Sequence, residues 1–340
     1  MDPLGLTPAV SDWLATALPA ARPPFTFTRI TGGRSNLTYL VADASGVRRV
    51  LRRPPLGEHP ANAHDVLREA RLLTALRGAV PVPEVLAICS DVEVTGAPFV
   101  MLEYLDGLVL RDPSSVQSGL SVVDCAVVGP AVVDALAALH SVDPARAGLG
   151  TLADRRDYLP RQLRRWHDNW TRTATRPLPD LARAHDRLVE LAPEQLRTGI
   201  VHGDFRLDNC LLDRTGTVLG VLDWELTTVG DPLADLGQFL VYWAEPGDSY
   251  TALHNPPTVV PGFATRAELA ARYFTQLDLA PVSVDYYLAF NWWKTACIVE
   301  NVYTRMAAGA MGTTERRPAS FAAQASALAT QAWRSAADLG

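Results

Sequence analysis

Apolar residues in the first third of the chain recur in short runs that alternate with polar residues, which is the pattern of half-buried β-strands. Gly, Pro and Ser residues separate these runs, as expected of hairpin turns. A longer stretch, residues 63–76, spaces its apolar positions as a helix does, and residues 7–18 are predicted to form a short amphipathic helix. The predicted strands are Phe25–Ile30, Leu37–Val41, Arg48–Arg53, a strand region beginning at Val80–Pro83, and Pro98–Glu103.

The spacing of apolar residues becomes helical after Asp106-Gly107. The predicted helices are Ser121–His140, Arg155–Arg172, Asp180–Leu191, Pro232–Trp243, Arg266–Leu277, Val284–Met306 and Pro318–Leu339. Short strands are predicted at Gly199–Val201, Cys210–Leu212 and Val218–Leu222. We therefore predict an α+β fold of two lobes. Residues 1–103 would form a small sheet-plus-helix lobe, and residues 104–340 a larger, mainly helical lobe.

Composition narrows the class of protein. With 340 residues, of which 48% are hydrophobic, the chain can bury a large core. The formal net charge of −6 argues against a nucleic-acid-binding protein, which usually carries a clustered basic face.

The four cysteines lie far apart without a CxxC pair, which argues against disulfides and a zinc site. We find no signal-peptide pattern and no long uninterrupted apolar run, so we expect a cytoplasmic protein without membrane association. Composition leaves the choice between monomer and homodimer open.

The most informative part of the sequence is Val201-His-Gly-Asp-Phe-Arg-Leu-Asp-Asn209, followed by Val221-Leu-Asp-Trp-Glu225. It combines Asp204, Asn209 and, after a short apolar hairpin, Asp223. In a phosphoryl-transfer loop, one carboxylate orients the attacking hydroxyl, while an amide and a second carboxylate hold Mg²⁺. The structural alternative is a hairpin with polar ends, in which Asp204 caps a turn. Because both halves of the pattern are present, we favour phosphoryl transfer.

A second candidate lies between two predicted strands, where Gly32, Gly33, Arg34, Ser35 and Asn36 follow one another. Paired glycines let backbone N–H groups approach phosphate oxygens, and the Ser35 hydroxyl adds a donor. Most Gly-Gly hairpins are only hairpins. The position of this one, N-terminal to the catalytic motif and in the small sheet lobe, favours a phosphate-binding loop.

Arg52 and Arg53 end a predicted strand, and Glu69 lies on the helix that follows. A kinase places its phosphate-contacting lysine and the glutamate paired with that lysine at corresponding positions. Arginine is not equivalent to lysine, because its planar fork is always charged and binds phosphates through two donors. The alternative is that both arginines are surface charges on an edge strand. The alternation of side chains along the strand favours Arg52 over Arg53 as the phosphate contact.

Other polar residues have simpler predicted roles. Asp231 and Asp235 precede and begin a helix, so we expect them to cap it and to brace the catalytic loop. His202 is expected to brace the same loop. Lys294 lies on a largely apolar helix, and we favour a side chain that extends to water over one that projects into an acceptor cleft.

With these motifs, the chain resembles the aminoglycoside phosphotransferase (APH) family, the small-molecule branch of the protein-kinase-like fold. Its likeness is greatest to the kinase-like domains that are associated with acyl-CoA dehydrogenases. The segments that carry the resemblance are 32–39, 50–55, 63–69, 80–83, 96–101 and the catalytic motif, with the helix at 286–305 continuing it. They are spread over most of the chain, and the HGDxxxxN sequence with its downstream Asp is highly specific.

The resemblance implies particular roles. Asp204 would be the catalytic aspartate, Asn209 and Asp223 would bind Mg²⁺, and residues 32–36 would bind the phosphates of ATP (or GTP). Glu103, Tyr104 and Leu105 would form the hinge that contacts the nucleotide base. The arginine at the place of the phosphate-binding lysine departs from the wider family, which leaves the pairing of Arg52 with Glu69 as a question for the structure.

We therefore predict an ATP- and Mg²⁺-dependent phosphotransferase that acts on a small-molecule hydroxyl, with a hydroxyacyl thioester or similar metabolite as acceptor. An aminoglycoside or another antibiotic is the second choice. No dense carboxylate cluster is evident for a cationic drug, whereas Arg161, Arg164 and Arg165 are prominent. A nucleotide-binding pseudokinase scaffold and a helical interaction protein are the rivals from other classes.

Overall fold

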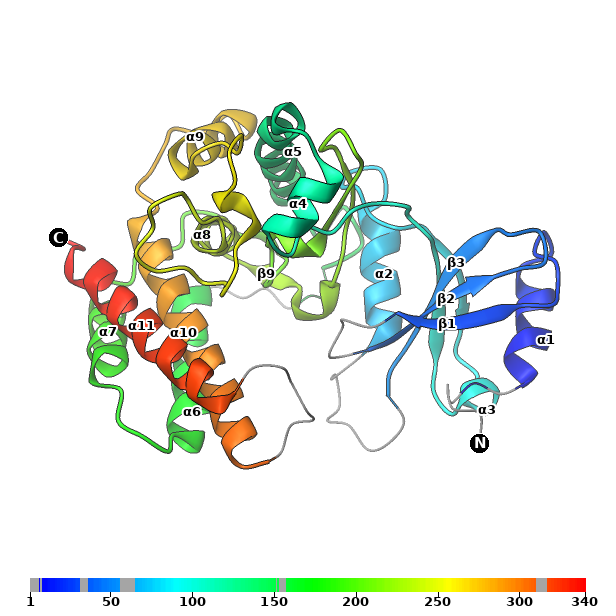
Figure 1. The fold of residues 1–340 in the computed structure, drawn as a ribbon, viewed down its shortest axis with the longest axis horizontal. Coiled ribbons are helices and arrows are strands. Elements are labelled where there is room, and N and C mark those ends of the chain that lie inside the picture. Colours follow the sequence, from blue (N-terminus) through cyan, green and yellow to red (C-terminus); the bar gives the residue numbers. More distant parts are fainter. Residues whose placement is uncertain are drawn as a thin grey trace.

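The computed structural model describes residues 6, 8–30, 36–55, 65–150, 152, 157–309 and 317–340. The chain forms a small lobe built on a sheet and a larger lobe of helices, with helix α2 (Val66–Leu76) between the sheet and the larger lobe (Figure 1). This arrangement confirms the predicted α+β, two-lobed, kinase-like fold.

The sheet of the small lobe has five antiparallel strands in the order β1-β2-β3-β5-β4. The strands are β1 (Thr26–Ile30), β2 (Leu37–Ala42), β3 (Arg48–Arg53), β4 (Val85–Cys89) and β5 (Phe99–Glu103). Four of them lie close to their predicted bounds. Strand β4 begins only at Val85, after Pro81 and Pro83, because proline has no N–H to donate to a neighbouring strand.

The two faces of this sheet are covered by different helices. On one face, α1 (Pro8–Ala17) and α3 (Val92–Thr95) pack on a core that includes Val10, Leu14, Tyr39, Leu51, Val94, Phe99 and Met101. Helix α2 packs on the opposite face, against Val100 and Leu102. Side chains alternate along a strand, so Arg52 points to the α2 face, whereas Arg53 points to the α1 face with Leu51.

The larger lobe is built mainly of helices. They are α4 (Pro113–Gly119), α5 (Val122–Ser141), α6 (Tyr158–Thr173), α7 (Pro179–Glu190), α8 (Leu233–Tyr242), α9 (Arg266–Gln276), α10 (Asp285–Ala307) and α11 (Pro318–Ala337). Helix α10 contacts α6, α7, α8 and α11. The predicted helices of this lobe are confirmed with small differences at their ends. The short helices α3 and α4 were not predicted, because one or two turns carry too little apolar periodicity to be recognised.

Two short antiparallel pairs carry the catalytic motif. Strand β6 (Gly199–Val201) pairs with β9 (Thr228–Gly230), and β7 (Cys210–Leu212) pairs with β8 (Val218–Val221). The N–H of Leu222 donates to the carbonyl oxygen of Asn209 at 2.8 Å, which extends the second pair. The predicted hairpin therefore brings Asn209 next to the segment that contains Asp223.

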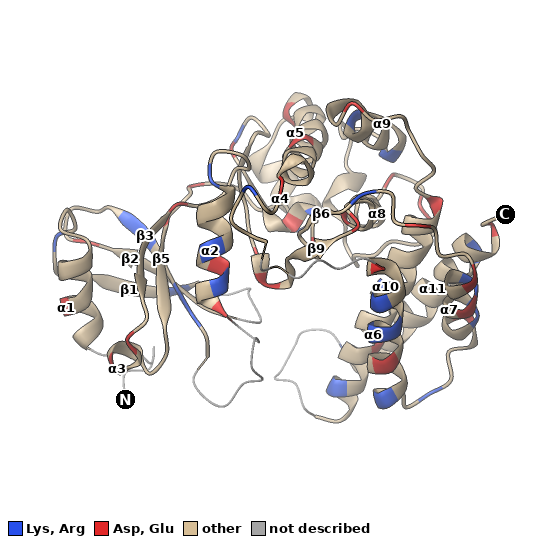
Figure 2. Ribbon diagram, turned by 180° about the vertical axis from the view of Figure 1, so that it is seen from behind, with Lys and Arg blue, Asp and Glu red and all other residues tan. Residues whose placement is uncertain are grey.

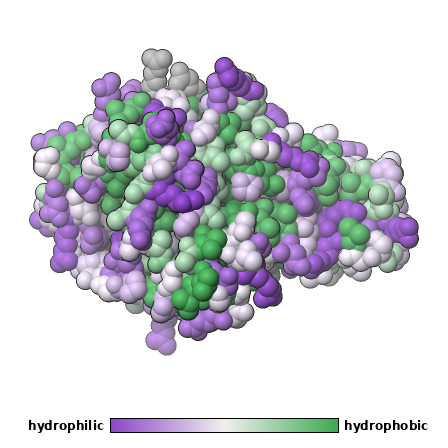
Figure 3. Space-filling model, turned by 90° about the horizontal axis from the view of Figure 1, so that it is seen from above, coloured by the Kyte–Doolittle hydropathy of each residue, from purple (hydrophilic) through white to green (hydrophobic). Residues whose placement is uncertain are grey.

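Helix α5 is long and apolar enough to cross a membrane, and it is the one helix in the described ranges that meets this criterion. Half of its apolar window is buried within the lobe, where it packs against α9 and β6. Val122, Val123 and Val127, near its N-terminal end, are exposed. Figure 3 views the molecule from the side of α5 and α9 and shows hydrophobic areas interspersed with hydrophilic ones.

Candidate active site

A cavity of about 310 Å³ lies between the two lobes. The small lobe lines it with residues of the sheet and of α2, and the larger lobe lines it with β8 and the segment that follows. Its lining includes Arg52, Glu69, Glu103, Tyr104, Leu105 and Asp223, together with Ile30, Val50, Leu102 and Trp224. Six residues that the sequence singles out in four separate segments are thus brought to one cavity.

Arg52 and Arg53 have different partners. The Nε of Arg52 lies 2.9 Å from Oε2 of Glu69, and its Nη2 lies 3.5 Å from Oδ1 of Asp223. Arg53 is buried on the other face of the sheet, where its Nη1 donates to the carbonyl oxygen of Thr95 at 2.8 Å. Arg52 is therefore the arginine of this pair that faces the cavity.

Glu69 is a buried carboxylate beside other acidic groups. Burial raises its pKa, and the neighbouring Asp223 and Glu225 raise the pKa further, whereas Arg52 opposes the shift. Removal of a carboxylate from water is costly unless a cation compensates the charge. The Arg52 guanidinium supplies that charge and bridges α2 to the loop of Asp223.

The segment after β5 joins the two lobes. The N–H of Glu103 donates to the carbonyl oxygen of Glu84 at 2.9 Å, and the N–H of Glu84 donates to Oε2 of Glu103 at 3.2 Å. The N–H of Leu105 has no hydrogen-bond partner within the described ranges. The backbone N–H of Leu105 can therefore donate to a nucleotide base in the cavity, whereas the N–H of Glu103 already donates to Glu84.

The predicted phosphate loop is described only at its end. Gly32, Gly33, Arg34 and Ser35 lie outside the described residues. Asn36 immediately precedes β2 and is buried, and its Oδ1 makes no hydrogen bond to the part of the chain that the structure describes. The role of the loop stays a prediction.

The backbone of the catalytic loop is fixed from helix α8. The carboxylate of Asp235 accepts the N–H of His202 at 2.6 Å and the N–H of Gly203 at 2.9 Å. Gly203 has a φ of +86°, and a Cβ there would lie 2.8 Å from the carbonyl oxygen of Leu226, so only glycine fits without displacement. Asp231 accepts the N–H of Leu233 at the start of α8. These contacts confirm the predicted bracing and capping roles of Asp235 and Asp231.

His202 braces the loop from within. Its Nε2 lies 3.0 Å from the carbonyl oxygen of Leu222, and the N–H of Asp204 points to its Nδ1 at 3.3 Å. A carbonyl can only accept and a backbone N–H can only donate, so Nε2 carries the proton and Nδ1 is bare. His202 thus joins the two halves of the motif, as predicted.

The carboxylate of Asp204 is held by three donors. Its Oδ1 accepts from Nε2 of Gln238 at 2.6 Å, and its Oδ2 accepts from Nδ2 of Asn209 at 3.1 Å and Nε of Arg206 at 3.2 Å. Burial alone would raise the pKa of Asp204, but the charges of Arg206 and Lys294 outweigh it and hold the pKa below its ordinary value. The group is therefore ionised at neutral pH and can accept a proton.

Asp223 lines the cavity, whereas Asn209 does not line it but lies beside the segment of Asp223 and offers an amide oxygen there. Nδ2 of Asn209 donates to the carbonyl oxygen of Asp204, at 2.8 Å, and to the Asp204 carboxylate. The amide Oδ1 of Asn209 takes part in neither of these bonds. Asp223 has a φ of +67° and a partly exposed side chain. An amide oxygen and a carboxylate suit Mg²⁺, which commonly takes few protein ligands and completes its shell with phosphate oxygens and water. The described residues contain no cluster of three or more His, Cys, Asp or Glu.

Three residues at this site were missed or misjudged from the sequence. Arg206 and Gln238 contact Asp204 but were not singled out. The prediction for Lys294 was wrong. Its Nζ does not extend to water but donates to the carbonyl oxygen of Gly203 at 3.1 Å and to Oε1 of Gln238 at 2.7 Å, and the residue is buried. The available signals were the position of Arg206 within the motif and of Gln238 one helical turn after Asp235.

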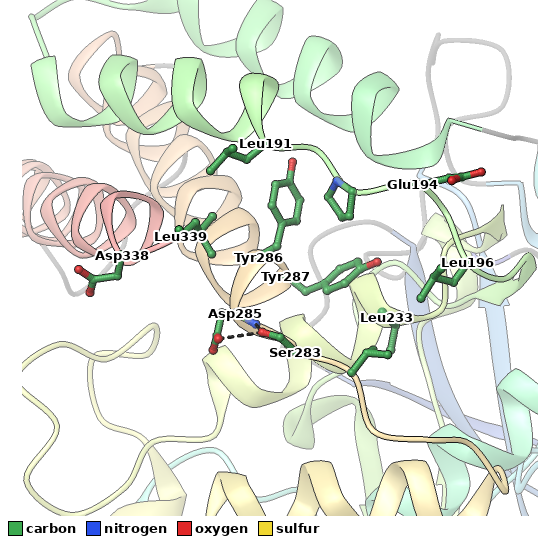
Figure 4. A pocket seen from close by; sticks show the side chains of 13 residues that line it. Leu191, Glu194, Leu196, Leu233, Ser283, Asp285, Tyr286, Tyr287, Asp338 and Leu339 are labelled. Carbon is green, nitrogen blue, oxygen red and sulfur yellow. Dashed lines mark hydrogen bonds between the residues drawn. The ribbon is translucent and has the colours of Figure 1, made fainter.

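A second cavity, of about 490 Å³, lies beside α10, the end of α7 and the last residues of the chain (Figure 4). Leu191, Leu233, Tyr286, Tyr287 and Leu339 are among the residues that line it. The hydrogen bond drawn in Figure 4 joins Ser283 to Asp285. None of the lining residues belongs to the catalytic motif, so we place the chemistry in the cavity between the lobes.

The fold is that of the kinase-like phosphotransferases. A model of the phosphotransferase enzyme family (APH) matches residues 26–285. The chain belongs to this family, as the sequence motifs predicted.

Curated relatives include the mouse (Mus musculus) acyl-CoA dehydrogenase family member 10, with 34% identity over 84% of this chain and 27% of the relative. The human (Homo sapiens) acyl-CoA dehydrogenase family member 11 is 29% identical over 84% of this chain and 37% of the relative. The chain thus spans well under half the length of these relatives.

Two solved structures illustrate the fold. A putative aminoglycoside phosphotransferase from Ralstonia eutropha superimposes with a TM-score of 0.81 and 28% identity, over 97% of both chains. The aminoglycoside phosphotransferase APH(4)-Ia, in a ternary complex with ADP and hygromycin B, has a TM-score of 0.63 and 18% identity, over 98% of this chain and 99% of the other. The second likeness concerns the fold alone.

Proposed function

We propose that this protein transfers the γ-phosphoryl group of ATP, with Mg²⁺, to a hydroxyl of a small molecule. The observation that carries the proposal is the ionised Asp204 carboxylate, which Gln238, Asn209 and Arg206 hold in place. The second half of its motif, residues 221–224, lines the cavity between the lobes. A fixed base of this kind is what a hydroxyl needs in order to attack a phosphoryl group.

In this mechanism Asp204 orients the acceptor hydroxyl and accepts its proton. The acceptor oxygen forms a new bond to the γ-phosphorus, the bond from phosphorus to the bridging oxygen breaks, and ADP leaves with that electron pair. Arg206 adds positive charge beside Asp204 and can face the transferred group. Most of the rate enhancement would come from positioning and from charge already in place.

The nucleotide would lie in the cavity, with its base at the Leu105 N–H and its phosphates toward Arg52. Asn209 and Asp223 would hold Mg²⁺, which, when bound, neutralises charge on the phosphate oxygens. The ion pair of Arg52 with Glu69 supports this placement, because it aims a guanidinium at the cavity from the position at which kinases have a lysine. The base contact serves ATP and GTP alike, so we propose ATP with GTP as the alternative.

For the acceptor, we propose a hydroxyacyl thioester or a similar neutral or anionic metabolite. Two cations, Arg206 and Lys294, lie beside Asp204, and the carboxylates of Asp208 and Asp235 lie beside these cations in turn. Helix α6 adds Arg161, Arg164 and Arg165, and Figure 2 shows basic residues along this helix. The ring of Trp166 lies 5.4 Å from the Arg165 guanidinium and 6.0 Å from the Lys294 ammonium. The arginines of α6 favour an anionic acceptor over a polycationic aminoglycoside.

An antibiotic acceptor remains the second candidate, because solved structures with this fold include aminoglycoside and macrolide phosphotransferases. A pseudokinase would retain nucleotide binding without transfer. We also propose a cytoplasmic location, since the four cysteines are buried and free, which suits a reducing compartment.

The experiment is phosphate transfer from Mg²⁺–ATP across a panel of hydroxyacyl-CoAs, aminoglycosides, macrolides and amino-alcohols. Asp204→Ala is the test variant, and Asp186→Ala, at an exposed carboxylate on α7, is the matched control. We expect transfer to a hydroxyacyl-CoA that Asp204→Ala abolishes and Asp186→Ala leaves unchanged. Asp204-dependent transfer to a drug alone would make the antibiotic function correct. Nucleotide binding without any transfer would overturn the enzyme proposal in favour of a pseudokinase.

A further inference from the structure

Lys294 is the single lysine of the sequence, and it is buried between the catalytic loop and helix α8. It lies on α10, which packs directly against α8 (Figure 1). Burial lowers the pKa of this ammonium, while the charges of Asp204 and Asp235 oppose that shift. Burial of a cation costs free energy unless hydrogen bonds or opposite charges compensate it. The contacts of Lys294 therefore indicate its role.

The contacts of Lys294 determine how the amide of Gln238 is oriented. An ammonium can only donate hydrogen bonds, so the group that it meets at 2.7 Å must be the amide oxygen, Oε1. The amide nitrogen Nε2 then faces the other way, toward Oδ1 of Asp204, at 2.6 Å. An ionised carboxylate can only accept hydrogen bonds. The charged groups at the two ends of the series Lys294–Gln238–Asp204 therefore define the direction of both hydrogen bonds in it.

This series leaves the two oxygens of Asp204 unequal. From the residues that the structure describes, Oδ2 accepts two hydrogen bonds, from Asn209 and Arg206, whereas Oδ1 accepts one, from Gln238. Each carboxylate oxygen can accept about two hydrogen bonds. Oδ1 therefore retains an acceptor position, and Gln238 determines where that position points.

Lys294 also fixes the loop that carries Asp204. Its second hydrogen bond, at 3.1 Å, goes to the carbonyl oxygen of Gly203, the residue immediately before the aspartate. Asp235 holds the N–H of the same glycine from α8. The peptide groups on both sides of Gly203 are thus fixed, one by α8 and the other by α10.

We propose that Lys294 and Gln238 are positioning residues for phosphoryl transfer, an inference that rests on the proposed function. Lys294 sets the orientation of the Gln238 amide, and Gln238 holds Oδ1 of Asp204 where it accepts the proton of the attacking hydroxyl. As that O–H bond breaks, the new O–P bond forms and ADP leaves with the electron pair of the broken P–O bond. Neither residue acts on the nucleotide itself.

The test is a double-mutant cycle of Lys294→Met and Gln238→Leu, with Lys294→Arg as the conservative variant. ADP release from Mg²⁺–ATP is measured with the acceptor that gives the highest Asp204-dependent rate, or with water as the acceptor. Asn291→Ala is the matched control, because Asn291 also joins α10 to α8, through the carbonyl oxygen of Ala234, but does not contact Asp204. Circular dichroism and thermal unfolding verify the fold of each variant.

We expect each single variant to lower kcat about 10- to 100-fold, the range for a misaligned general base, with KM for ATP within twofold of wild type. The effects should be strongly non-additive, because Lys294 acts through Gln238. Lys294→Arg should restore part of kcat, and Asn291→Ala should lower stability without lowering kcat. If Lys294→Met does not fold, Gln238→Leu alone provides the kcat test.

Unchanged kcat in the variants, alongside wild-type turnover that requires Asp204, would overturn this inference and leave the proposed function intact. Additive losses, or equal losses in Asn291→Ala, would reduce both residues to a structural role and overturn it as well. Absence of any Asp204-dependent turnover would overturn the proposed function and this inference together.

Discussion

The Nε of Arg52 lies 2.9 Å from Oε2 of Glu69, so an arginine on β3 and a glutamate on α2 form an ion pair at the wall of the interlobe cavity. The same guanidinium reaches Asp223 with Nη2, at 3.5 Å. A lysine has a single ammonium nitrogen, so it could not contact the two carboxylates through separate nitrogens. The forked arginine therefore links the small lobe to the loop that we propose for the metal.

Replacement of Arg52 by lysine should weaken Mg²⁺–ATP binding without unfolding the protein. The charge beside Glu69 is kept, but the second nitrogen near Asp223 is lost, and we expect Kd to rise about 3- to 10-fold, or roughly 1 kcal/mol. Isothermal titration calorimetry measures the change. Arg53→Lys is the matched control, since Arg53 contacts Thr95 on the other face of the sheet. Equal effects of both substitutions would contradict the assignment.

Asp223→Asn should remove the dependence of nucleotide binding on Mg²⁺. The variant keeps the size of the side chain but loses the charge that suits the cation. We expect wild type to bind ATP at least about tenfold more tightly with Mg²⁺ than with EDTA, and the variant to show little difference. Asp213→Asn, on the exposed turn between β7 and β8, is the control. A variant with undiminished Mg²⁺ dependence would exclude Asp223 as a ligand.

Gly203→Ala should reduce both stability and transfer. Gly203 has a φ of +86°, and its added Cβ would lie 2.8 Å from the backbone oxygen of Leu226, which cannot move as a flexible side chain can. We expect about 1–3 kcal/mol of destabilisation from backbone strain, and a lower kcat because the loop of Asp204 shifts. Gly46→Ala separates the two effects, since Gly46 has a similar φ of +82° but open space around it. Thermal unfolding and transfer assays compare the two variants, and the loss of kcat should be confined to Gly203→Ala.

Arg176→Met should destabilise the larger lobe more than any exposed ion pair could. The guanidinium of Arg176 binds both oxygens of Glu300, through Nε at 3.0 and 3.2 Å and Nη2 at 2.5 Å, and Glu300 is buried. Its removal leaves a buried carboxylate without its counter-charge, which costs about 3 kcal/mol. Arg146→Met, in a largely exposed ion pair, should cost less than about 0.5 kcal/mol. Urea denaturation of both variants measures the difference, and similar midpoints would refute the prediction.

Asp43 should make stability depend on pH in the acid range. The hydrogen bond from the Ser45 hydroxyl, with further hydrogen bonds from Arg49 and from backbone N–H groups, holds the pKa of Asp43 well below its ordinary value. The unfolded state therefore binds the proton more readily, so the stabilisation is present above the unfolded pKa and is lost as pH falls toward the folded pKa. The stability difference between wild type and Asp43→Asn should shrink as pH is lowered from 6 to 3. A difference that is constant over this range in urea titrations would contradict it.

The sequence alone determined the features that depend on neighbouring residues. The alternation along residues 48–53 predicted that Arg52 and Arg53 lie on opposite faces, and the apolar hairpin predicted that Asn209 and Asp223 approach each other. Both are observed, because strand periodicity and short turns are local properties of the chain. The family followed from the same local motifs.

Only the tertiary structure decided what surrounds Asp204. Helix α8 supplies Gln238 and helix α10 supplies Lys294, from positions 34 and 91 residues away from their partners in the catalytic loop. The apolar pattern around Lys294 predicted a buried helix. It could not show that two hydrogen-bond acceptors from other segments lie within reach of the ammonium, so the prediction of an exposed charge was wrong. Whether a buried polar group is satisfied depends on which distant segments pack against it, and that information is absent from the spacing of residues along one helix.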